Sequence, residues 1–265
     1  MTGNRFRPVA WVAALLFAWS GGTSSPRAED APLVAAASDL QFALDEVAAA
    51  FARDTGRRIR LVLGSSGNFT RQIRQGAPFQ LFLSADEEYV LALAREGLTE
   101  GDGVLYAIGR IALVAGPGAS FEPDSELASL RAALTAGRIA RFAIANPEHA
   151  PYGRRAEEAL RHAGLWGLAE KRLVLGENVS QAAQFALSGN VDGGIVAYSL
   201  ILSPKLRGLA PHALIPESWH SPLRQRMVLL RGAGPVARHF HAYIQQPPAR
   251  AILREHGFAL PGESG

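Results

Sequence analysis

Cysteine is absent from the 265 residues of this chain. Without a thiol the protein can form no disulfide and can carry no lipid on an N-terminal cysteine, so its stability has to come from an apolar core. The G-x-S-x-G, Walker and H-E-x-x-H motifs of hydrolases, nucleotide-binding proteins and zinc proteases are absent as well. We therefore expect a protein that is not an enzyme and that uses no cofactor.

Long apolar runs are lacking after the N-terminus, where no stretch approaches the ~20 residues that span a bilayer. The first 28 residues are different. Arg5 and Arg7 precede the apolar "VAWVAALLFAWS", and the small residues of "GGTSSPRA" follow. This order is typical of a signal peptide cleaved after Ala28, and the apolar stretch is short for the alternative, a membrane anchor. Export without cysteine suits a bacterial periplasmic protein.

An excess of charge of one sign is missing from the remainder of the chain. The formal net charge is +3, from 27 basic and 24 acidic residues, and three arginines within residues 1–28 account for the whole excess. A balanced chain gives no electrostatic reason to bind nucleic acid or an anionic membrane surface. We expect neither as a partner.

Short apolar stretches that alternate with amphipathic ones dominate the rest of the sequence. "PLVAAAS", "RIRLVLGSS" and "FQLFLSAD" are each followed by a helical pattern, and the alternation resumes with "RFAIANP" and "KRLVLGENV". This pattern predicts an α/β fold of mostly parallel sheets flanked by helices. It occurs in two rounds, joined by "IGRIALVAG" and "SWHSPLRQRMVLL", so we predict two lobes with a cleft between them. The predicted boundaries are 1–28 for the signal peptide, 29–109 plus 219–265 for lobe I, and 110–218 for lobe II.

Four of the predicted strand-to-helix junctions carry small or hydroxyl-bearing residues. A helix N-terminus presents unpaired N–H groups and a positive partial charge. Each serine alone would be an ordinary N-cap, but four such ends that face one cleft could bind an anion without any lysine or arginine. The junctions contain Ser38, Ser65 to Gly67, Pro151 to Gly153, and Asn178 to Ser180.

Charged residues at two of the predicted helix starts are expected to be solvated. Asp86, Glu87 and Glu88 suit the positive end of a helix dipole. Arg154 and Arg155 fall in a first helical turn, where cations are disfavoured. From solvent they would add only long-range attraction for an anion.

At these junctions the sequence resembles the periplasmic molybdate-binding proteins (ModA type) of molybdate ABC transporters. The resemblance covers nearly the whole chain after residue 28. It implies a two-lobed type II periplasmic binding fold that closes on molybdate or tungstate. The implied partners are an ABC permease and its ATPase, and a monomer is expected. It rests on the ordered segments "AAASDL", "GSSGNFTRQI", "GAPFQLFLSAD", "NPEHAPYGRRAEEAL", "NVSQAAQFALSGNVDGGIVAYS" and "AILREHGF".

The resemblance also implies a set of oxyanion-binding residues. Carried over by position, the ligands would be the hydroxyl and amide of Ser38, the hydroxyl and amide of Ser66, and the backbone amides of Tyr152 and Val179. These groups would contact molybdate oxygens and would not ligate the metal directly. Asp39, next to Ser38, is the fifth residue of the predicted oxyanion-binding set.

Two positions depart from the family pattern. Asp39 stands where other members carry Leu or Asn, and its carboxylate would repel an anion unless it faces solvent or the N–H groups of its own helix. Ala197 stands where several members carry a tyrosine whose hydroxyl binds the anion. Tyr198 comes one residue later, and Tyr152 is a candidate to fill part of the gap.

Other functions stay open. A site made only of donors suits a fully deprotonated dianion, because the O–H of protonated phosphate would lack an acceptor at a cost of roughly 1–3 kcal/mol. Sulfate would have to be rejected by cavity size. The alternatives are a sulfate or phosphate carrier, with Asp39 in the cleft favouring phosphate, a secreted enzyme on the same bilobal fold, and a sensing subunit.

Overall fold

The computed structural model describes residues 1–2, 31–203, 208 and 210–262. The predicted signal peptide, residues 1–28, lies outside the described residues apart from its first two. Residues Ala31–Gly265 form one compact unit that contains the helices and strands of the fold. Within the described part, no helix has both the length and the apolar character needed to cross a membrane.

The first sheet has five strands in the spatial order β2-β1-β3-β10-β4. β1 pairs in parallel with β2 and β3, whereas β10 runs antiparallel to β3 and β4. The chain leaves this sheet after β4 and returns to it in β10. The strands are β1 (Leu33–Ala37), β2 (Arg60–Gly64), β3 (Phe79–Ser84), β4 (Val104–Gly109) and β10 (Leu223–Leu229).

The second sheet also has five strands, in the order β7-β6-β8-β5-β9. β6 is parallel to β7 and β8, and β5 is antiparallel to β8 and β9. Only Arg110 separates β4 from β5, so one extended crossing joins the two sheets. The strands are β5 (Ile111–Ala115), β6 (Phe142–Ala145), β7 (Leu173–Gly176), β8 (Gly193–Ala197) and β9 (His212–Leu214).

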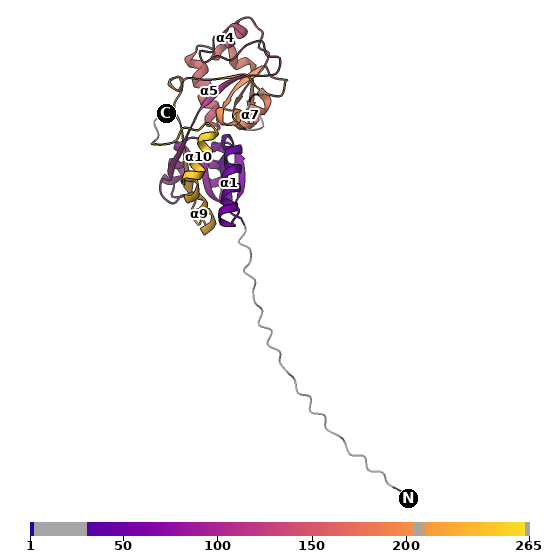
Figure 1. The fold of residues 1–265 in the computed structure, drawn as a ribbon, viewed down its shortest axis with the longest axis vertical. Coiled ribbons are helices and arrows are strands. Elements are labelled where there is room, and N and C mark those ends of the chain that lie inside the picture. Colours follow the sequence, from indigo (N-terminus) through magenta and orange to yellow (C-terminus); the bar gives the residue numbers. More distant parts are fainter. Residues whose placement is uncertain (3–30, 204–207, 209, 263–265) are drawn as a thin grey trace. The chain divides into compact units, whose positions relative to one another are not determined.

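Helices cover both sheets, and Figure 1 shows α1, α9 and α10 around the first sheet and α4, α5 and α7 around the second. The helices that follow strands of the first sheet, or close the chain, are α1 (Gln41–Thr55), α2 (Ser66–Arg74), α3 (Glu87–Arg95), α9 (Pro235–Ile244) and α10 (Pro247–Glu255). Those between strands of the second are α4 (Ala128–Thr135), α5 (Pro151–His162), α6 (Trp166–Ala169), α7 (Val179–Ala186) and α8 (Tyr198–Ile201). Short 3₁₀ turns are η1 (Ser38–Leu40), η2 (Glu170–Arg172) and η3 (Glu217–Trp219).

The predicted α/β fold with two lobes is confirmed, although each sheet is more mixed than predicted. The two crossings explain the difference, because β10 and β5 enter their sheets against the direction of the strands beside them. The first-sheet strands come from 33–109 and 223–229, and the second-sheet strands from 111–214. The exact lobe boundaries, 29–109 plus 219–265 and 110–218, stay a prediction.

The first sheet is buried on both faces, as expected for strands covered by helices on each side. Along β1, Val34 and Ala36 belong to the apolar cluster of α1, α9 and α10. Ala35, between them, joins the opposite cluster with Phe69 and Phe82. This alternation is the period of two expected for a strand, and it fixes which ends of the strands and helices meet the second lobe.

Gly153 allows α5 to begin directly against β6. A Cβ atom at this position would lie 2.1 Å from the carbonyl oxygen of Ala145 and 2.9 Å from the backbone nitrogen of Pro147. Both contacts are with backbone, which cannot rotate away. Any larger residue would therefore push the first turn of α5 off the strand.

We expect Gly153→Ala to lower the free energy of unfolding by at least the roughly 1–3 kcal/mol typical of overpacking. Urea denaturation of the purified protein measures it. The matched control is Gly167→Ala in α6, where a Cβ would meet nothing within 4 Å; this change should stay within about 0.5 kcal/mol. Equal unfolding midpoints for the two variants would show that the close approach is not a constraint.

Candidate functional site

All five sequence-predicted site residues line one small pocket. Ser38 and Asp39 follow β1, Ser66 follows β2, Tyr152 follows β6 and Val179 follows β7. The pocket thus lies beyond the carboxyl ends of strands from both sheets, the usual binding position in open α/β sheets. The remaining lining residues are Ala37, Gly64, Ser65, Ala85, Ala150 and Pro151.

Backbone N–H groups of three helix starts belong to the lining residues. Ser66 and Val179 are the first residues of α2 and α7, and Tyr152 is the second residue of α5. Amides in a first turn have no acceptor within their own helix, and they carry the positive end of the helix dipole. The pocket is therefore bordered by groups that can donate hydrogen bonds to an anion.

The capping pattern differs in part from the expected one. Ser65 caps α2 by accepting from the Asn68 amide, and Asn178 caps α7 by accepting from the Gln181 amide. Ser38, expected as an N-cap, instead begins η1, and no side chain caps η1 or α1. The cap prediction was wrong at Ser38 because a 3₁₀ turn precedes the α-helix.

The hydroxyls of Ser38 and Ser66 each already accept a backbone hydrogen bond. The Ser180 amide donates to Ser38 Oγ at 3.2 Å, and the Ala85 amide donates to Ser66 Oγ at 3.0 Å. A hydroxyl whose oxygen accepts still has its own proton to donate. Both serines are buried, with 2% and 0% of their surface exposed, so these protons can only be used locally.

Asp39 does not face solvent, which was one of the two expected orientations; the other, toward the N–H groups of its own turn, holds in part, because the backbone amides of Asp39 and Leu40 bond to its carboxyl. It is 1% exposed, and its Oδ2 accepts from the Tyr152 hydroxyl at 3.0 Å and from Gln225 Nε2 at 2.6 Å. Tyr106 in turn donates to Gln225 Oε1 at 2.8 Å. Tyr152 comes from α5 of the second lobe, whereas the other three residues belong to elements of the first sheet, so this network joins the lobes.

The acidity of Asp39 reflects this environment. Burial raises the pKa of Asp39 from 3.8 to about 6, although the hydrogen bonds from Gln225 and Tyr152 and the nearby backbone amides lower it. Burial and the negative charge of Asp39 also hold the pKa of Tyr152 well above its usual range. Tyr152 therefore stays neutral and serves as a donor to the carboxylate.

Neither candidate tyrosine hydroxyl replaces the one missing at Ala197. β8 ends at Ala197, and Tyr198 begins α8, where its ring lies beneath the Arg110 guanidinium, 5.0 Å from ring centre to carbon. Tyr198 is absent from the pocket lining. The Tyr152 hydroxyl points to Asp39 and Gln225, so Tyr152 can contribute its amide to the pocket.

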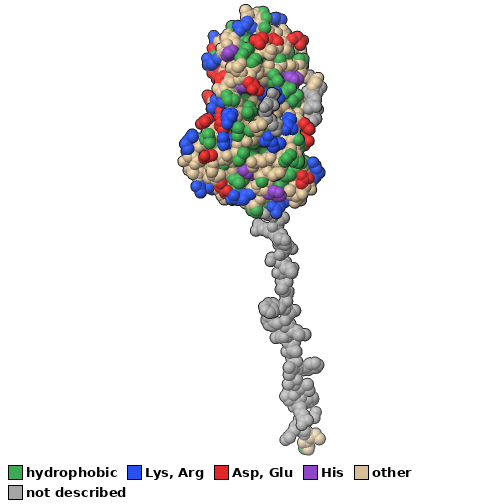
Figure 2. Space-filling model, turned by 60° about the vertical axis from the view of Figure 1, so that its left-hand side comes forward, with side chains coloured by type: hydrophobic (Ala, Val, Ile, Leu, Met, Phe, Trp, Pro, Cys, Tyr) green, Lys and Arg blue, Asp and Glu red, His purple; other side chains and the backbone are tan. Residues whose placement is uncertain are grey.

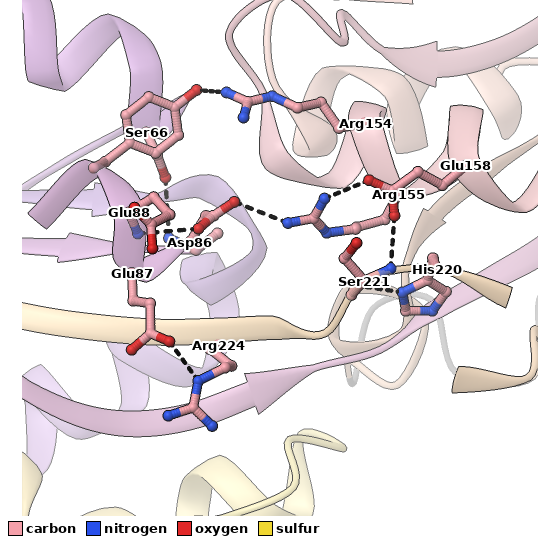
Figure 3. Close-up of polar contacts among 12 residues, drawn as sticks. Ser66, Asp86, Glu87, Glu88, Arg154, Arg155, Glu158, His220, Ser221 and Arg224 are labelled. Carbon is pink, nitrogen blue, oxygen red and sulfur yellow. Dashed lines mark hydrogen bonds and ion pairs between the residues drawn. The ribbon is translucent and has the colours of Figure 1, made fainter. Parts of the chain in front are cut away.

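The first turn of α5 also carries two arginines that hold the first lobe. Figure 3 shows Arg155 reaching Asp86, the N-cap of α3, and Glu158 on its own helix, at 2.9 and 2.6 Å. Arg154 donates to the Tyr89 hydroxyl and lies over that ring. The expectation of solvated arginines was wrong, since Arg155 is only 8% exposed. The sequence alone could not predict that an acidic residue of the other lobe pairs with Arg155.

Two of the three acidic residues at the start of α3, Asp86 and Glu87, are also less solvated than expected, whereas Glu88 is exposed as predicted. Asp86 is 7% exposed, and Glu87 pairs with Arg224 and Arg226 of β10 at 2.5 and 2.8 Å. Basic and acidic side chains intermingle over the face that Figure 2 shows. Because these charged side chains pair with one another, the helix N-termini are the source of positive potential at the pocket.

Sequence reasoning missed three polar residues of this region. Gln225 and Tyr106 are buried and support Asp39. His149 lies with its Nδ1 3.0 Å from Ser65 Oγ, and its carbonyl accepts from the Gly67 amide. A glutamine inside the apolar strand pattern of "RQRMVLL" was the one visible signal. Among the described residues, no group of three His, Cys, Asp or Glu side chains could hold a metal ion.

Two lobes meet over a small pocket that amide and hydroxyl donors border, an arrangement that suits the binding of a small solute. Residues 32–259 match the family model of the bacterial extracellular solute-binding proteins, and the chain belongs to this family.

Relatives within this family confirm the resemblance read from the sequence. A Rhodobacter capsulatus protein, molybdate-binding protein ModA, is 32% identical over 240 residues, which cover 89% of this chain and 91% of that protein. A protein of the same name from Azotobacter vinelandii is 33% identical and covers 86% and 89%. The solved structure of an Azotobacter vinelandii periplasmic molybdate-binding protein aligns with a TM-score of 0.78 at 31% identity, covering 87% of this chain and 99% of that one.

The raised pKa of Asp39 gives a testable dependence of stability on pH. A group whose folded pKa is raised contributes its stability below its unfolded pKa of 3.8 and loses it as the pH rises through about 6. The full cost of ionising Asp39 is about 3 kcal/mol. In Asp39→Asn this cost is absent. We therefore expect the stability of the variant relative to wild type to increase by about 1 kcal/mol between pH 5 and pH 8.

Urea denaturation of the ligand-free proteins at both pH values measures this difference. Other titrating groups are shared, so they cancel between the two proteins. Asp54→Asn is the matched control, because Asp54 also accepts from a tyrosine, Tyr243, at 2.6 Å but does not line the pocket. A wild-type-to-variant difference that does not change with pH would contradict the assignment.

Proposed function

We propose that this protein captures molybdate, and tungstate, in the bacterial periplasm and delivers it to an ABC permease driven by its ATPase. The observation that carries the proposal is the donor set of the pocket: two buried serine hydroxyls that keep their protons, and amides from three helix starts. The molybdate-binding relatives, which align over nearly the whole chain, support the ligand.

The proposed ligands are the hydroxyls and amides of Ser38 and Ser66 and the amides of Tyr152 and Val179. Molybdate and tungstate are fully deprotonated dianions near neutral pH and can only accept hydrogen bonds, which matches the serine hydroxyls and the helix-start amides; the Asp39 carboxyl, which lines the same pocket, is an acceptor. Their charge would be balanced by the helix dipoles and not by a cation. Sulfate has the same charge and is smaller, so longer contacts would discriminate against it.

A phosphate carrier is the second candidate, and Asp39 is the observation that favours it. Oδ1 of Asp39 is buried and has no hydrogen-bond partner among the described residues. An acceptor of this kind could receive the O–H of hydrogen phosphate. Oδ2, by contrast, already accepts two hydrogen bonds from protein groups.

We expect isothermal titration calorimetry of the mature, anion-stripped protein to show tight one-to-one binding of molybdate and tungstate. Sulfate and phosphate should give no comparable heat. Ser66→Ala and Ser38→Ala should each weaken molybdate roughly 10- to 100-fold, because a hydrogen bond to a charged group contributes about 1.5–3 kcal/mol.

Ser188→Ala is the matched control for these variants, since Ser188 is an exposed serine that donates to the Phe185 carbonyl and accepts from the Asn190 amide, and it does not line the pocket. Its affinity for molybdate should equal that of the wild type. Tight phosphate binding with silent molybdate would replace the proposed function by the second candidate. Turnover of a phosphorylated metabolite would favour an enzyme instead.

The proposal also includes closure of the lobes on the anion, with α5 as the closing element. Its first turn bears the Tyr152 amide at the pocket, while Tyr152, Arg154 and Arg155 each bond to the first lobe. The ion pair of Arg155 with Asp86 is 2.9 Å long, and both side chains are 10% exposed. The pair joins α5 to the start of α3, so it would form only while the lobes are in contact and would favour the closed form.

We expect Arg155→Gln to weaken molybdate binding at least tenfold, because the closed, binding-competent form would be less populated. Calorimetry gives the affinity, and small-angle X-ray scattering without ligand should give a larger radius of gyration than for wild type. Arg161→Gln is the control on the same helix, where Arg161 pairs with Glu157 in solvent. If both variants bind like wild type, the ion pair does not support closure.

A further inference from the structure

A carboxyl group is buried where the proposed oxyanion would bind. Asp39 lines the same pocket as Ser38, Ser66 and Tyr152. It is 1% exposed, so water cannot screen its charge. Tyr152 connects Asp39 directly to the anion-binding amides, because its hydroxyl donates to the Asp39 carboxyl while its own amide borders the pocket. An anion in the pocket and an ionised Asp39 would therefore repel each other at short range.

We propose that Asp39 couples oxyanion binding to the uptake of one proton. In the empty protein near neutral pH the carboxylate is ionised, and it takes a proton from solvent when a dianion occupies the pocket. The carboxylate becomes a carboxylic acid and no other bond changes. This inference rests on the proposed function.

The hydrogen bonds indicate which oxygen receives the proton. Oδ2 accepts from both Tyr152 and Gln225, so its lone pairs are engaged. Oδ1 is buried and unpartnered among the described residues. Protonation at Oδ1 therefore leaves the hydrogen bonds from Tyr152 and Gln225 to Oδ2 in place, and the interlobe network can persist in the bound form.

Among the described residues, no cation contributes to the pKa of Asp39 and so none holds it ionised. The titratable groups that face it are phenols, Tyr106 on β4 and Tyr152 on α5, and the pKa of each is raised by burial and by the charge of Asp39 itself. β10 contributes the neutral Gln225, and α8 contributes Ser199, whose hydroxyl donates to the Asp39 carbonyl. The α7 start adds only Val179 and Ser180, so a second negative charge has no compensation.

The pKa of Asp39 determines how the affinity for the anion changes with pH. Burial raises the pKa of Asp39 to about 6 in the empty protein, despite the donors Gln225 and Tyr152. Below that pH the group is already protonated and binding should be independent of pH. Above it, each bound dianion requires a proton. The dissociation constant should then rise up to tenfold per pH unit until the pKa of the occupied form is passed.

The coupling also separates molybdate from protonated phosphate. Molybdate brings no proton at neutral pH, so the proton must come from buffer. Hydrogen phosphate could supply its own proton to Oδ1 and bind without net uptake. The number of protons exchanged therefore reports both the ligand and the role of Asp39.

The experiment is calorimetry with sodium molybdate at pH 7.0 in buffers that differ in ionisation enthalpy, such as PIPES and imidazole, followed by a pH series from 5.5 to 8. For wild type we expect the observed enthalpy to change with buffer in proportion to nearly one proton taken up. Asp39→Asn should show almost no uptake and a pH-independent affinity. Circular dichroism confirms that the variant is folded.

Two further variants keep the test decisive. Tyr152→Phe removes a donor that lowers the pKa of Asp39, so the carboxyl should be more protonated at pH 7 before binding, and the uptake should fall below that of wild type. Asp54→Asn, which alters a carboxylate bonded to Tyr243 away from the pocket lining, should take up the same number of protons as wild type.

Tight molybdate binding without proton uptake, or equal uptake by wild type and Asp39→Asn, would overturn the inference and leave the proposed function standing. No molybdate heat at any pH would overturn both. Phosphate binding without net uptake would likewise replace both with the phosphate carrier. If Asp39→Asn does not fold, the wild-type buffer series and Tyr152→Phe decide, and unchanged uptake in Tyr152→Phe counts against Asp39.

Discussion

Unpaired N–H groups at helix starts are the constraint on which the site depends. A first helical turn cannot satisfy its own amides, and this chain places three such turns, those of α2, α5 and α7, around one small pocket. Ser38 and Ser66 supply further donors. Each hydroxyl oxygen accepts a hydrogen bond from a backbone amide, and each hydroxyl keeps its own proton to donate. An anion that only accepts hydrogen bonds would satisfy these unpaired donors, whereas a neutral or donating ligand would not.

The first turn of α5 links anion recognition to the contact between the lobes. Pro151 provides a helix start without an N–H of its own, and Gly153 permits close packing on β6. The same turn then presents the Tyr152 amide to the pocket and sends Tyr152, Arg154 and Arg155 to the first lobe. A shift of this turn would change both functions together, because backbone and side chains belong to one rigid element.

The sequence predicted the α/β alternation, the two lobes and the meeting of four helix starts, because these features follow from local periodicity and from helix-start chemistry repeated at four junctions. The individual site residues were predicted from the resemblance to a known family. It could not predict the partners of Asp39 or Arg155. Gln225 is 186 residues from Asp39 along the chain, and Asp86 is 69 from Arg155. Such pairs depend on how the lobes meet, which no local pattern encodes. The 3₁₀ turn at Ser38 was missed because its residues are equally suitable for a cap.

The ionised carboxylate of Asp39 is unfavourable at this site for two separate reasons. A carboxylate buried among apolar residues destabilises the protein when it is ionised, and an anion beside it adds repulsion. Tyr152 and Gln225 offset part of the first cost by donating to Oδ2, and Tyr106 holds Gln225 in that orientation. Nothing among these neutral groups offsets the second. A proton on Oδ1 removes both costs at once while the donors stay in place, so the carboxyl that opposes an anion when ionised becomes compatible with it when neutral. A leucine at this position would avoid the repulsion, but it could neither bind Tyr152 across the lobes nor make affinity respond to pH.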